Sequence, residues 1–417
     1  MLTGLKEPSR PKFCPAIIRE QGGYRTLVEG NSFQITPLSF SGDWRGRFWA
    51  KAFLYLANMD ISIIIPTFNR SSLLRRTLES LALCIPSSEA VEILVIDNGS
   101  TDETTDTFHE IRQTFIRHNW RYFYEWVPSL LAARHRGYKE SSGSILTYLD
   151  DDVLLAADWF NGLKDAFSNP IAALVGGPSR PRYESDPPEW LDALWWKFQG
   201  GRVLGALSLI DLGTHKKLID PCFVFGLNYS IRRSVLKECG GFNPDTFPKA
   251  LQRYQGDGET GLSLKVKAKG HQALYHPDVA VTHLIPAPRL APEALEQRGF
   301  FQGVCDSYTR IRTEGRMPTP PARSWKDPFR PLMRKFNRAA LLMGWHVRPI
   351  SKLIGRAYTR GVAFHQNEVR NDPILLEWVL RPDYLDVELP KGWQRYANLP
   401  DLDRHRAGKF LPERRDP

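Results

Sequence analysis

The chain has 417 residues, of which 42% are hydrophobic and 24% charged, a globular composition that excludes a fibrous or largely disordered protein. Lys and Arg outnumber Asp and Glu by 56 to 46. This excess favours an anionic partner, such as a sugar nucleotide, an anionic membrane or a nucleic acid, unless it only solubilises the surface. The five cysteines show no CxxC spacing, so neither a zinc site nor a disulfide framework is indicated, and a reducing cytoplasm fits best.

Residues 1–59 show no clear periodicity and are expected to form an N-terminal extension. They lack the apolar stretch of a signal peptide, and nowhere do the roughly 18 consecutive apolar residues of a membrane-spanning helix occur. Contact with a membrane is therefore expected to be peripheral.

Strand and helix patterns alternate from residue 60 onward. Short apolar runs predict buried strands at 61–65, 91–96 and 144–149, and helical spacing predicts helices at 71–83, 103–117 and 131–142. Ser100 and Glu103 have the spacing of a helix capping box. The alternation predicts an α/β fold with a mostly parallel central sheet.

Three adjacent aspartates, Asp150, Asp151 and Asp152, directly follow the third predicted strand. Like charges at close range raise one another's pKa values unless a cation relieves them, and carboxylate-rich sites suit Mg²⁺ or Mn²⁺. Ligands of open α/β sheets bind outside the carboxyl ends of the strands. The residues alone leave open a metal site or a solvated turn.

The later parts of the chain are less regular. Residues 177–221 are rich in Pro and Trp and are expected to form a long aromatic loop, and 311–417 form a basic, Pro/Arg-rich, partly helical C-terminal region. Within it, segment 331–360 mixes basic and apolar residues. It could attach the protein to anionic lipid at the inner face of the plasma membrane, or pack back on the preceding domain.

Four motifs in this order resemble those of family 2 glycosyltransferases: IIIPTFNR at 63–70, VIDNGSTD at 95–102, ARHRG at 133–137 and LDDD at 149–152. The resemblance covers about 60–290 and implies a GT-A fold for a domain at 60–310. It also implies Mn²⁺ or Mg²⁺ as cofactor, a nucleoside-diphosphate sugar (UDP or other) as donor, and inversion at the anomeric carbon.

The resemblance further implies roles for individual residues. Those that would contact the nucleotide sugar are Pro66, Thr67, Asn69, Asp97, Arg134, Asp150, Asp151 and Asn228. Asp152 and His283, together with Asp150, would hold the metal ion. From the residues alone, Thr67 and Asn69 could equally shape a turn, Arg134 could form a structural ion pair, and His283 could be a structural hydrogen-bonding residue.

An inverting transfer needs a carboxylate that removes the proton of the acceptor hydroxyl. Glu259 stands where the family's catalytic acid lies, and Gly258 stands where the family has a preceding acid. Asp257 is the alternative base. Either acid could instead only stabilise a helix N-terminus by its charge.

The expected activity is transfer of one sugar to a hydroxyl of a glycan, lipid-linked or cell-envelope acceptor. The chain lacks a Q-x-x-R-W motif, which argues against a processive synthase, and nucleic acid is not an expected partner. A nucleotidyltransferase is disfavoured because no Gly-rich phosphate loop follows the first strand. A catalytically silent sugar- or nucleotide-binding protein would leave the ordered acids unexplained.

Overall fold

The structure is a computed structural model that describes residues 60–318, 348–386, 388–390 and 393. The predicted extension at 1–59 and the first half of the predicted basic segment, 331–347, lie outside these residues. The boundaries drawn at 59 and 310 therefore stay predictions.

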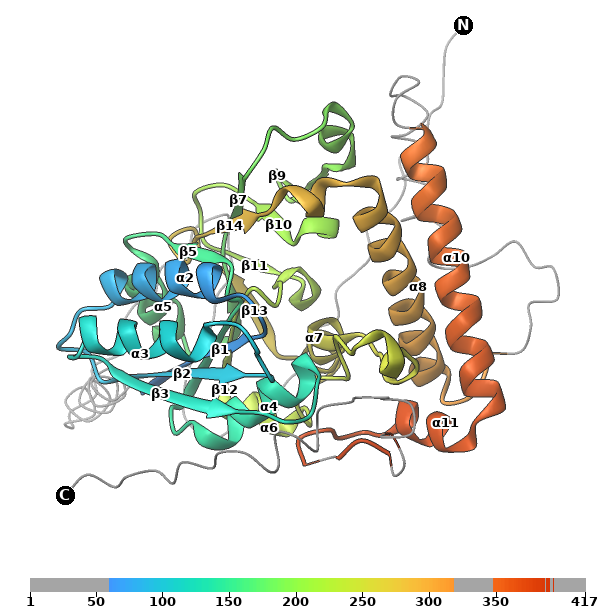
Figure 1. The fold of residues 1–417 in the computed structure, drawn as a ribbon, viewed down its shortest axis with the longest axis horizontal. Helices are drawn as coiled ribbons and strands as arrows, with labels where there is room; N and C mark the ends of the chain where they lie inside the picture. The colour runs from blue at the N-terminus through green and yellow to red at the C-terminus, as the bar shows by residue number, and fades with distance from the viewer. Residues whose placement is uncertain (1–59, 319–347, 387, 391–392, 394–417) are drawn as a thin grey trace, which may run out of the picture. The chain divides into compact units, whose positions relative to one another are not determined.

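An eight-stranded sheet forms the centre of the fold (Figure 1). In spatial order its strands are β11 (Lys217–Ile219), β13 (Gln272–Tyr275), β6 (Ala172–Gly176), β12 (Asn228–Arg232), β4 (Ile145–Leu149), β1 (Ile61–Thr67), β2 (Val91–Asp97) and β3 (Asn119–Tyr124). β3, β2, β1 and β4 pair in parallel, whereas β12 and β11 run antiparallel to their neighbours. The predicted α/β class with a mostly parallel sheet is confirmed.

The central strands form because their residues are apolar on both faces. Every residue of β1 and β2 is buried, as expected for parallel strands covered by helices on both sides. Of the predicted strands, 61–65, 91–96 and 144–149 correspond to β1, β2 and β4. The strand β3 was not predicted, because its sequence NWRYFY lacks the β-branched apolar run of β1 and β2 and is mostly half-buried.

Helices cover the sheet where the helical spacing predicts them. α2 (Ser71–Cys84), α3 (Thr104–Thr114) and α4 (Leu130–Glu140) match the three predicted helices, and α5 (Trp159–Ser168), α6 (Arg233–Glu238) and α7 (Gly258–Ala268) follow. The predicted capping box is wrong. Glu103 makes no capping bond, and the Ser100 hydroxyl accepts from the Asn69 amide at 2.9 Å, while the Asp102 carboxylate accepts from the Thr104 amide at 3.1 Å.

A second, six-stranded sheet replaces the predicted aromatic loop. Its strands are, in order, β5 (Val153–Leu155), β14 (Val281–Ile285), β7 (Ser179–Tyr183), β10 (Leu209–Asp211), β9 (Gly201–Leu204) and β8 (Trp196–Phe198). The prediction of a loop at 177–221 was wrong because strands of three to five residues are too short to show periodicity among Pro and Trp. Trp196 packs against Phe198 and Phe223, so this aromatic side chain belongs to the packed interior of the segment.

Two long helices, α8 (Pro292–Glu314) and α10 (Arg348–Asn371), pack side by side, and the short α11 (Pro373–Leu380) contacts both (Figure 1). The second half of the predicted basic segment is the start of α10. Glycines allow the close approach, since a Cβ on Gly303 would lie 2.1 Å from the carbonyl oxygen of Tyr358. Within the described part of the chain, no helix has the length and apolar character to cross a membrane.

The close approach of the two helices predicts a contrast between two glycine variants. Gly303→Ala should lower the free energy of unfolding by about 1–3 kcal/mol, because the new methyl group forces the helices apart. Gly355→Ala on α10 meets nothing within 4 Å and should stabilise by about 0.5–1 kcal/mol through helix propensity. Urea titration followed by circular dichroism measures both, and equal effects would contradict this packing.

Candidate active site

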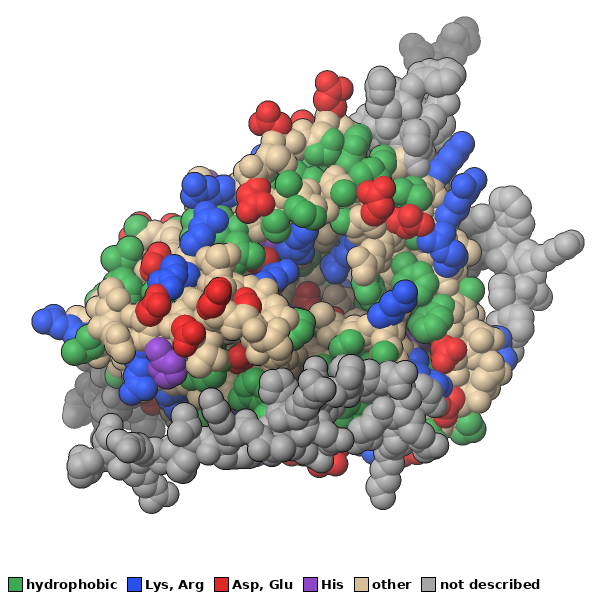
Figure 2. All heavy atoms as spheres, in the orientation of Figure 1, with side chains coloured by type: hydrophobic (Ala, Val, Ile, Leu, Met, Phe, Trp, Pro, Cys, Tyr) green, Lys and Arg blue, Asp and Glu red, His purple; other side chains and the backbone are tan. Residues whose placement is uncertain are grey.

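The polar residues of the predicted site gather at one edge of the central sheet. β1, β2 and β4 are parallel neighbours, so their carboxyl ends place Thr67, Asp97 and Asp150 at the same edge. Figure 2 shows a hollow in this face of the molecule, with Lys and Arg side chains and Asp and Glu side chains on its walls. This edge is therefore the candidate active site.

Asp151 is tied to the end of β1. Its carboxylate accepts a hydrogen bond from the Thr67 hydroxyl at 2.7 Å and pairs with the Arg70 guanidinium at 2.9 Å. Burial raises the pKa of Asp151 to about 6, although Arg70 acts in the opposite direction. The predicted contact of Thr67 and Asp151 with the nucleotide sugar stays a prediction; here the two residues bond to each other.

Asp152 and His283 meet where the chain passes from one sheet to the other. Asp152 directly precedes β5, and β5 pairs with β14 so that Val153 lies opposite His283. The imidazole Nε2 is 3.5 Å from Oδ1 of Asp152, which is buried and has no hydrogen-bond partner among the described residues. The imidazole Nδ1 is 3.0 Å from the carbonyl oxygen of Leu207, so Nδ1 donates there and the lone pair of Nε2 accepts from Nη1 of Arg289 at 3.0 Å.

This pair fits a divalent cation. A metal-bound histidine usually donates its other ring N–H to a carbonyl or carboxylate, and Leu207 provides such an acceptor. Within the described ranges, no group of three or more His, Cys, Asp or Glu is arranged to hold a metal ion. Mg²⁺ is commonly bound by one or two carboxylates together with substrate phosphates and water, so the pair is a sufficient protein contribution.

Two arginines neutralise the acids in this structure. Arg70 lies 2.9 Å from Asp152 as well as from Asp151, and Arg289 lies 3.3 Å from Asp152 and 3.0 Å from Nε2 of His283. Arg289 belongs to the short helix η5 (Ala287–Leu290), which follows β14. Without such cations the two buried carboxylates of Asp151 and Asp152 would be costly, because desolvation disfavours each charge.

Asp150 connects the metal-ligand pair to a second group of charges. Burial raises the pKa of its carboxyl, and the negative charge of Asp152 adds to this effect. The charges of Arg134, Glu259 and His283 also act on it. Asp150 therefore interacts electrostatically with both the pair Asp152–His283 and the pair Arg134–Glu259.

Arg134, on α4, is buried against two carboxylates. Its Nη1 lies 3.4 Å from Glu259 and 3.5 Å from Asp245, and its guanidinium lies over the ring of Phe242. Although burial acts in the opposite direction, the charge of Arg134 lowers the pKa of Glu259, so Glu259 is ionised. The predicted contact of Arg134 with the nucleotide stays a prediction, because these acids engage the guanidinium here.

Asp257 and Glu259 lie in different surroundings. Asp257 is buried and accepts hydrogen bonds from Asn243 at 2.7 Å and from Thr309 at 2.6 Å, and burial raises its pKa. Glu259, in the first turn of α7, accepts only from Arg134 among the side chains of the described residues, at the longer distance of 3.4 Å. This environment favours Glu259 over Asp257 as the residue that can accept a proton.

The other predicted nucleotide-binding residues have roles within the fold. The buried Asp97 accepts from the Ser100 amide at 2.8 Å and from the Tyr122 hydroxyl. Asn69, at a φ of +51°, accepts from the Thr101 amide at 2.7 Å. These bonds order the loops that follow β1 and β2, and the base-binding role of Asp97 stays a prediction.

Asn228 and Pro66 are both buried in the central sheet. The Asn228 side chain accepts from the Trp159 indole at 3.2 Å and donates to the Val279 carbonyl at 2.9 Å. Those two bonds use both ends of its amide, which is a structural role. Pro66 lies in β1 opposite Ile96 of β2.

Sequence reasoning missed Arg70, Asp245 and Arg289, although all three contact predicted site residues. Arg70 was within reach, because it closes the IIIPTFNR motif. Asp245 and Arg289 lie in segments without a recognisable pattern. Only the three-dimensional arrangement brings them to the acids.

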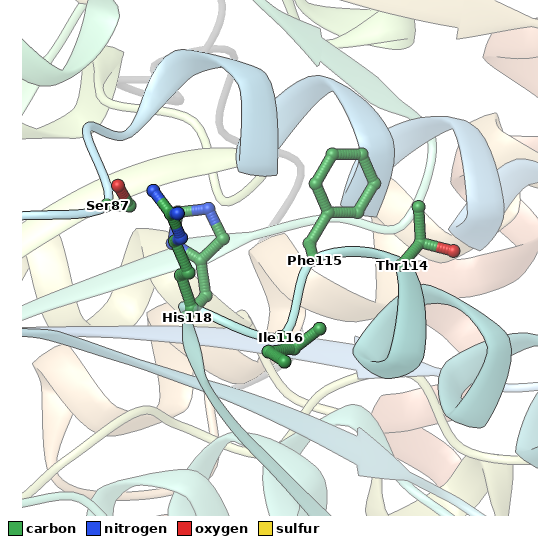
Figure 3. Close-up of a pocket in the computed structure, with 6 residues that line it drawn as sticks. Ser87, Thr114, Phe115, Ile116 and His118 are labelled. Atoms are coloured by element: carbon green, nitrogen blue, oxygen red, sulfur yellow. The ribbon is translucent and has the colours of Figure 1, made fainter.

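A separate surface pocket of about 290 Å³ lies beyond the end of α3 (Figure 3). Ser87, Thr114, Phe115, Ile116, Arg117 and His118 line it. These residues precede β2 and β3, so the pocket lies at the amino ends of these strands, opposite the candidate site. None of the predicted site residues lines it.

Comparison with known proteins places the central part of the chain in a family. Residues 62–240 match the model for glycosyl transferase family 2. The chain carries a family 2 glycosyltransferase domain. The matched residues include β1, β2, β4 and the three aspartates, so the acids at the sheet edge belong to a glycosyltransferase, and the predicted GT-A fold is confirmed.

Three relatives of this glycosyltransferase illustrate the family. A glucosyl-dolichyl phosphate glucuronosyltransferase of Haloferax volcanii is 24% identical over 59% of this chain and 75% of its own length. A validoxylamine A glucosyltransferase of Streptomyces hygroscopicus is 29% identical over 44% of this chain and 47% of its own length. The O-antigen chain rhamnosyltransferase RfbN of Salmonella typhimurium is 25% identical over 59% of this chain and 72% of its own length. The second match thus spans about half of the relative.

A solved mannosyltransferase, PcManGT from Pyrobaculum calidifontis in complex with GDP-Man and Mn²⁺, is 18% identical to this glycosyltransferase, with a TM-score of 0.45 over 81% of this chain and 94% of that one. The names of the three relatives specify three different sugars. The family match therefore defines the reaction class, sugar transfer, and leaves the donor sugar to be determined.

Proposed function

We propose that this glycosyltransferase transfers a single sugar, with inversion, from a nucleoside-diphosphate sugar to an acceptor hydroxyl in a metal-dependent reaction. The observation that carries the proposal is the close pair Asp152–His283, whose charges act on Asp150 together with the charge of the ionised Glu259. One side of the site can hold a cation and the diphosphate, and the other can accept a proton.

On the donor side, Asp152 and His283, with Asp150 beside them, would hold Mn²⁺ or Mg²⁺. Such an ion supplies positive charge that stabilises the leaving diphosphate. Arg70 and Arg289 already lie against Asp152, and guanidinium groups are well suited to pair with phosphate oxygens. Phe68, which is 55% exposed directly after β1, offers an apolar surface near the nucleotide.

On the acceptor side, Glu259 would remove the proton of the attacking hydroxyl. A base in an inverting transfer must face the sugar from the side opposite the leaving group, and Glu259 comes from α7, whereas Asp152 precedes β5 and His283 comes from β14. Its low pKa keeps it ionised at neutral pH. The names of the relatives include a dolichyl phosphate and an O-antigen chain, so we propose a lipid-linked or cell-envelope glycan as acceptor.

A catalytically silent sugar- or nucleotide-binding protein is the alternative. Such a protein would explain the hollow and its cations but would not need an ionised carboxylate such as Glu259. The family match argues against a nucleotidyltransferase, since residues 62–240 fit a family of sugar transferases.

The metal assignment predicts that Asp152→Asn removes most of the activity and most of the Mn²⁺ affinity, because it deletes a ligand charge. His283→Ala should cause a partial loss of both. Mn²⁺ titration followed by electron paramagnetic resonance measures the affinity. Matched controls are Asp186→Asn and His215→Ala, at exposed positions. Wild-type turnover and Mn²⁺ binding in Asp152→Asn would refute the assignment.

The base assignment predicts that Glu259→Gln lowers the transfer rate at least ~10²-fold, as expected for loss of a general base, with unchanged binding of the nucleoside diphosphate. Asp257→Asn should lower the rate much less and instead lower the melting temperature, because Asn243 and Thr309 lose their charged acceptor. Rates at saturating donor, calorimetric titration and thermal melts separate the two. An inactive Asp257→Asn beside an active Glu259→Gln would move the base to Asp257.

We also propose that the protein works in the cytoplasm, at the inner face of the plasma membrane. The described cysteines, Cys84, Cys222, Cys239 and Cys305, carry free thiols, which suits a reducing compartment. Lys352 and Arg356 are exposed on α10. These two cations can face an anionic lipid surface.

The membrane proposal predicts that the protein floats with anionic vesicles and not with neutral phosphatidylcholine vesicles. The double variant Lys352→Glu/Arg356→Glu should float several-fold less, since each basic residue contributes about 1 kcal/mol near such a surface. Equal recovery with both kinds of vesicle would exclude the electrostatic contact.

A further inference from the structure

A carboxylate from another part of the chain fills the space of a side chain missing from the acidic motif. Gly258, where the family pattern has an acid, adopts a φ of +53°. A Cβ on Gly258 would lie 2.5 Å from Oδ2 and 2.7 Å from Cγ of Asp245. No residue larger than glycine fits at 258 while Asp245 stays in place. The two positions therefore depend on each other.

Asp245 is held firmly in this position. Its Oδ1 accepts hydrogen bonds from Gln255 and from Thr246, each at 3.1 Å. Thr246 has a φ of +48°, a conformation that is unfavourable for a β-branched residue and persists only where the surroundings impose it. The loop is thus constrained so that Asp245 points its other oxygen toward Arg134.

Asp245 and Glu259 share one nitrogen atom. Nη1 of Arg134 lies 3.5 Å from Oδ2 of Asp245 and 3.4 Å from Oε2 of Glu259. These distances are long for charge-assisted hydrogen bonds, which are usually about 2.7–2.9 Å. The guanidinium is therefore divided between two acids and does not bind Glu259 in a close pair.

We propose that Asp245 is a positioning residue for Glu259: it replaces the acid missing at 258 and, by sharing Arg134, keeps that arginine from neutralising the base. This inference rests on the proposed role of Glu259 in sugar transfer. Asp245 itself need not contact the substrate. Its function is to keep the Glu259 carboxylate oriented and basic.

The charges around Asp245 indicate how its effect depends on pH. Burial and then the charge of Glu259 raise the pKa of Asp245 to about 6. Three titratable or charged groups interact with Asp245 directly: Arg134 from α4, Glu259 from α7 and Cys305 from α8. Glu259 in turn interacts with the charges of Asp150 and Arg298. Below pH 6 Asp245 becomes neutral, Arg134 is left to Glu259 alone, and the base weakens.

A double-mutant cycle tests the proposal. The rate is the release of nucleoside diphosphate at saturating donor with water as acceptor, using UDP-glucose, UDP-N-acetylglucosamine and GDP-mannose as probes. Asp245→Asn should lower kcat about 10-fold without changing donor KM, and Asp245→Asn/Glu259→Gln should match Glu259→Gln within about 3-fold, because the two residues act as a unit. Asp186→Asn, at an exposed position, is the matched control.

The pH profile provides a second readout that needs only the wild-type protein. We expect the kcat of the wild-type protein to fall as the pH decreases through about 6. The kcat of Asp245→Asn should already be reduced at neutral pH and should show no such fall near pH 6. The role of Asp245 would be overturned if the rate losses of the two single variants multiply in the double variant. A wild-type rate in Asp245→Asn, or a wild-type kcat that stays constant between pH 5 and 7.5, would overturn it as well. A fully active Glu259→Gln, or no turnover of any probe, would instead contradict the proposed function.

Discussion

The site depends on how negative charge is kept at one edge of a buried sheet. Asp151 and Asp152 are almost completely buried, and Asp150 experiences the charges of both Asp152 and Glu259. Carboxylates in such positions persist only if cations lie close by. Arg70, Arg134 and Arg289 provide these cations from three separate elements. Two of the arginines that stabilise the folded edge, Arg70 and Arg289, are thus also the ones proposed to pair with the phosphates of the donor.

The two sheets make this arrangement possible. β4 ends at Leu149 in the central sheet and β5 begins at Val153 in the second one, so the three aspartates occupy the crossing between them. Pairing of β5 with β14 then brings His283 to Asp152, although 131 residues separate them in sequence. A change in the register of β14 by one residue would turn His283 to the other face of the sheet. The second sheet is therefore part of the candidate active site.

Prediction from the sequence worked where one pattern extends over a whole element. The apolar runs of β1, β2 and β4 and the leucine spacing of α2 define those elements, and their order is enough for the α/β class. The second sheet escaped prediction because its strands have only three to five residues. The resemblance to the family led to Asp150, Asp152, Glu259 and His283, whose arrangement in the structure suits the roles proposed for them. Their partners Asp245 and Arg289 come from irregular segments, and only tertiary contacts reveal them.

The departure at Gly258 shows why a motif has to be considered together with its surroundings. Taken alone, a glycine in place of an acid casts doubt on the base, yet Asp245 supplies a carboxylate in the same volume. Asp257, the nearer acid in sequence, is bound to Asn243 and Thr309 and serves the packing of α7 against α8. The acid nearest to Glu259 in the sequence, Asp257, is therefore not the acid that shares Arg134 with it, which is Asp245.

The central claim is that this edge of the sheet transfers sugar from a nucleotide donor with the help of a divalent ion. The most direct measurement is mass spectrometry of the products from a panel of nucleotide sugars incubated with the protein and Mn²⁺, with and without EDTA. The account predicts release of nucleoside diphosphate from at least one donor and its loss with EDTA. Binding of nucleoside diphosphates without turnover of any donor, or turnover that EDTA leaves unchanged, would contradict it.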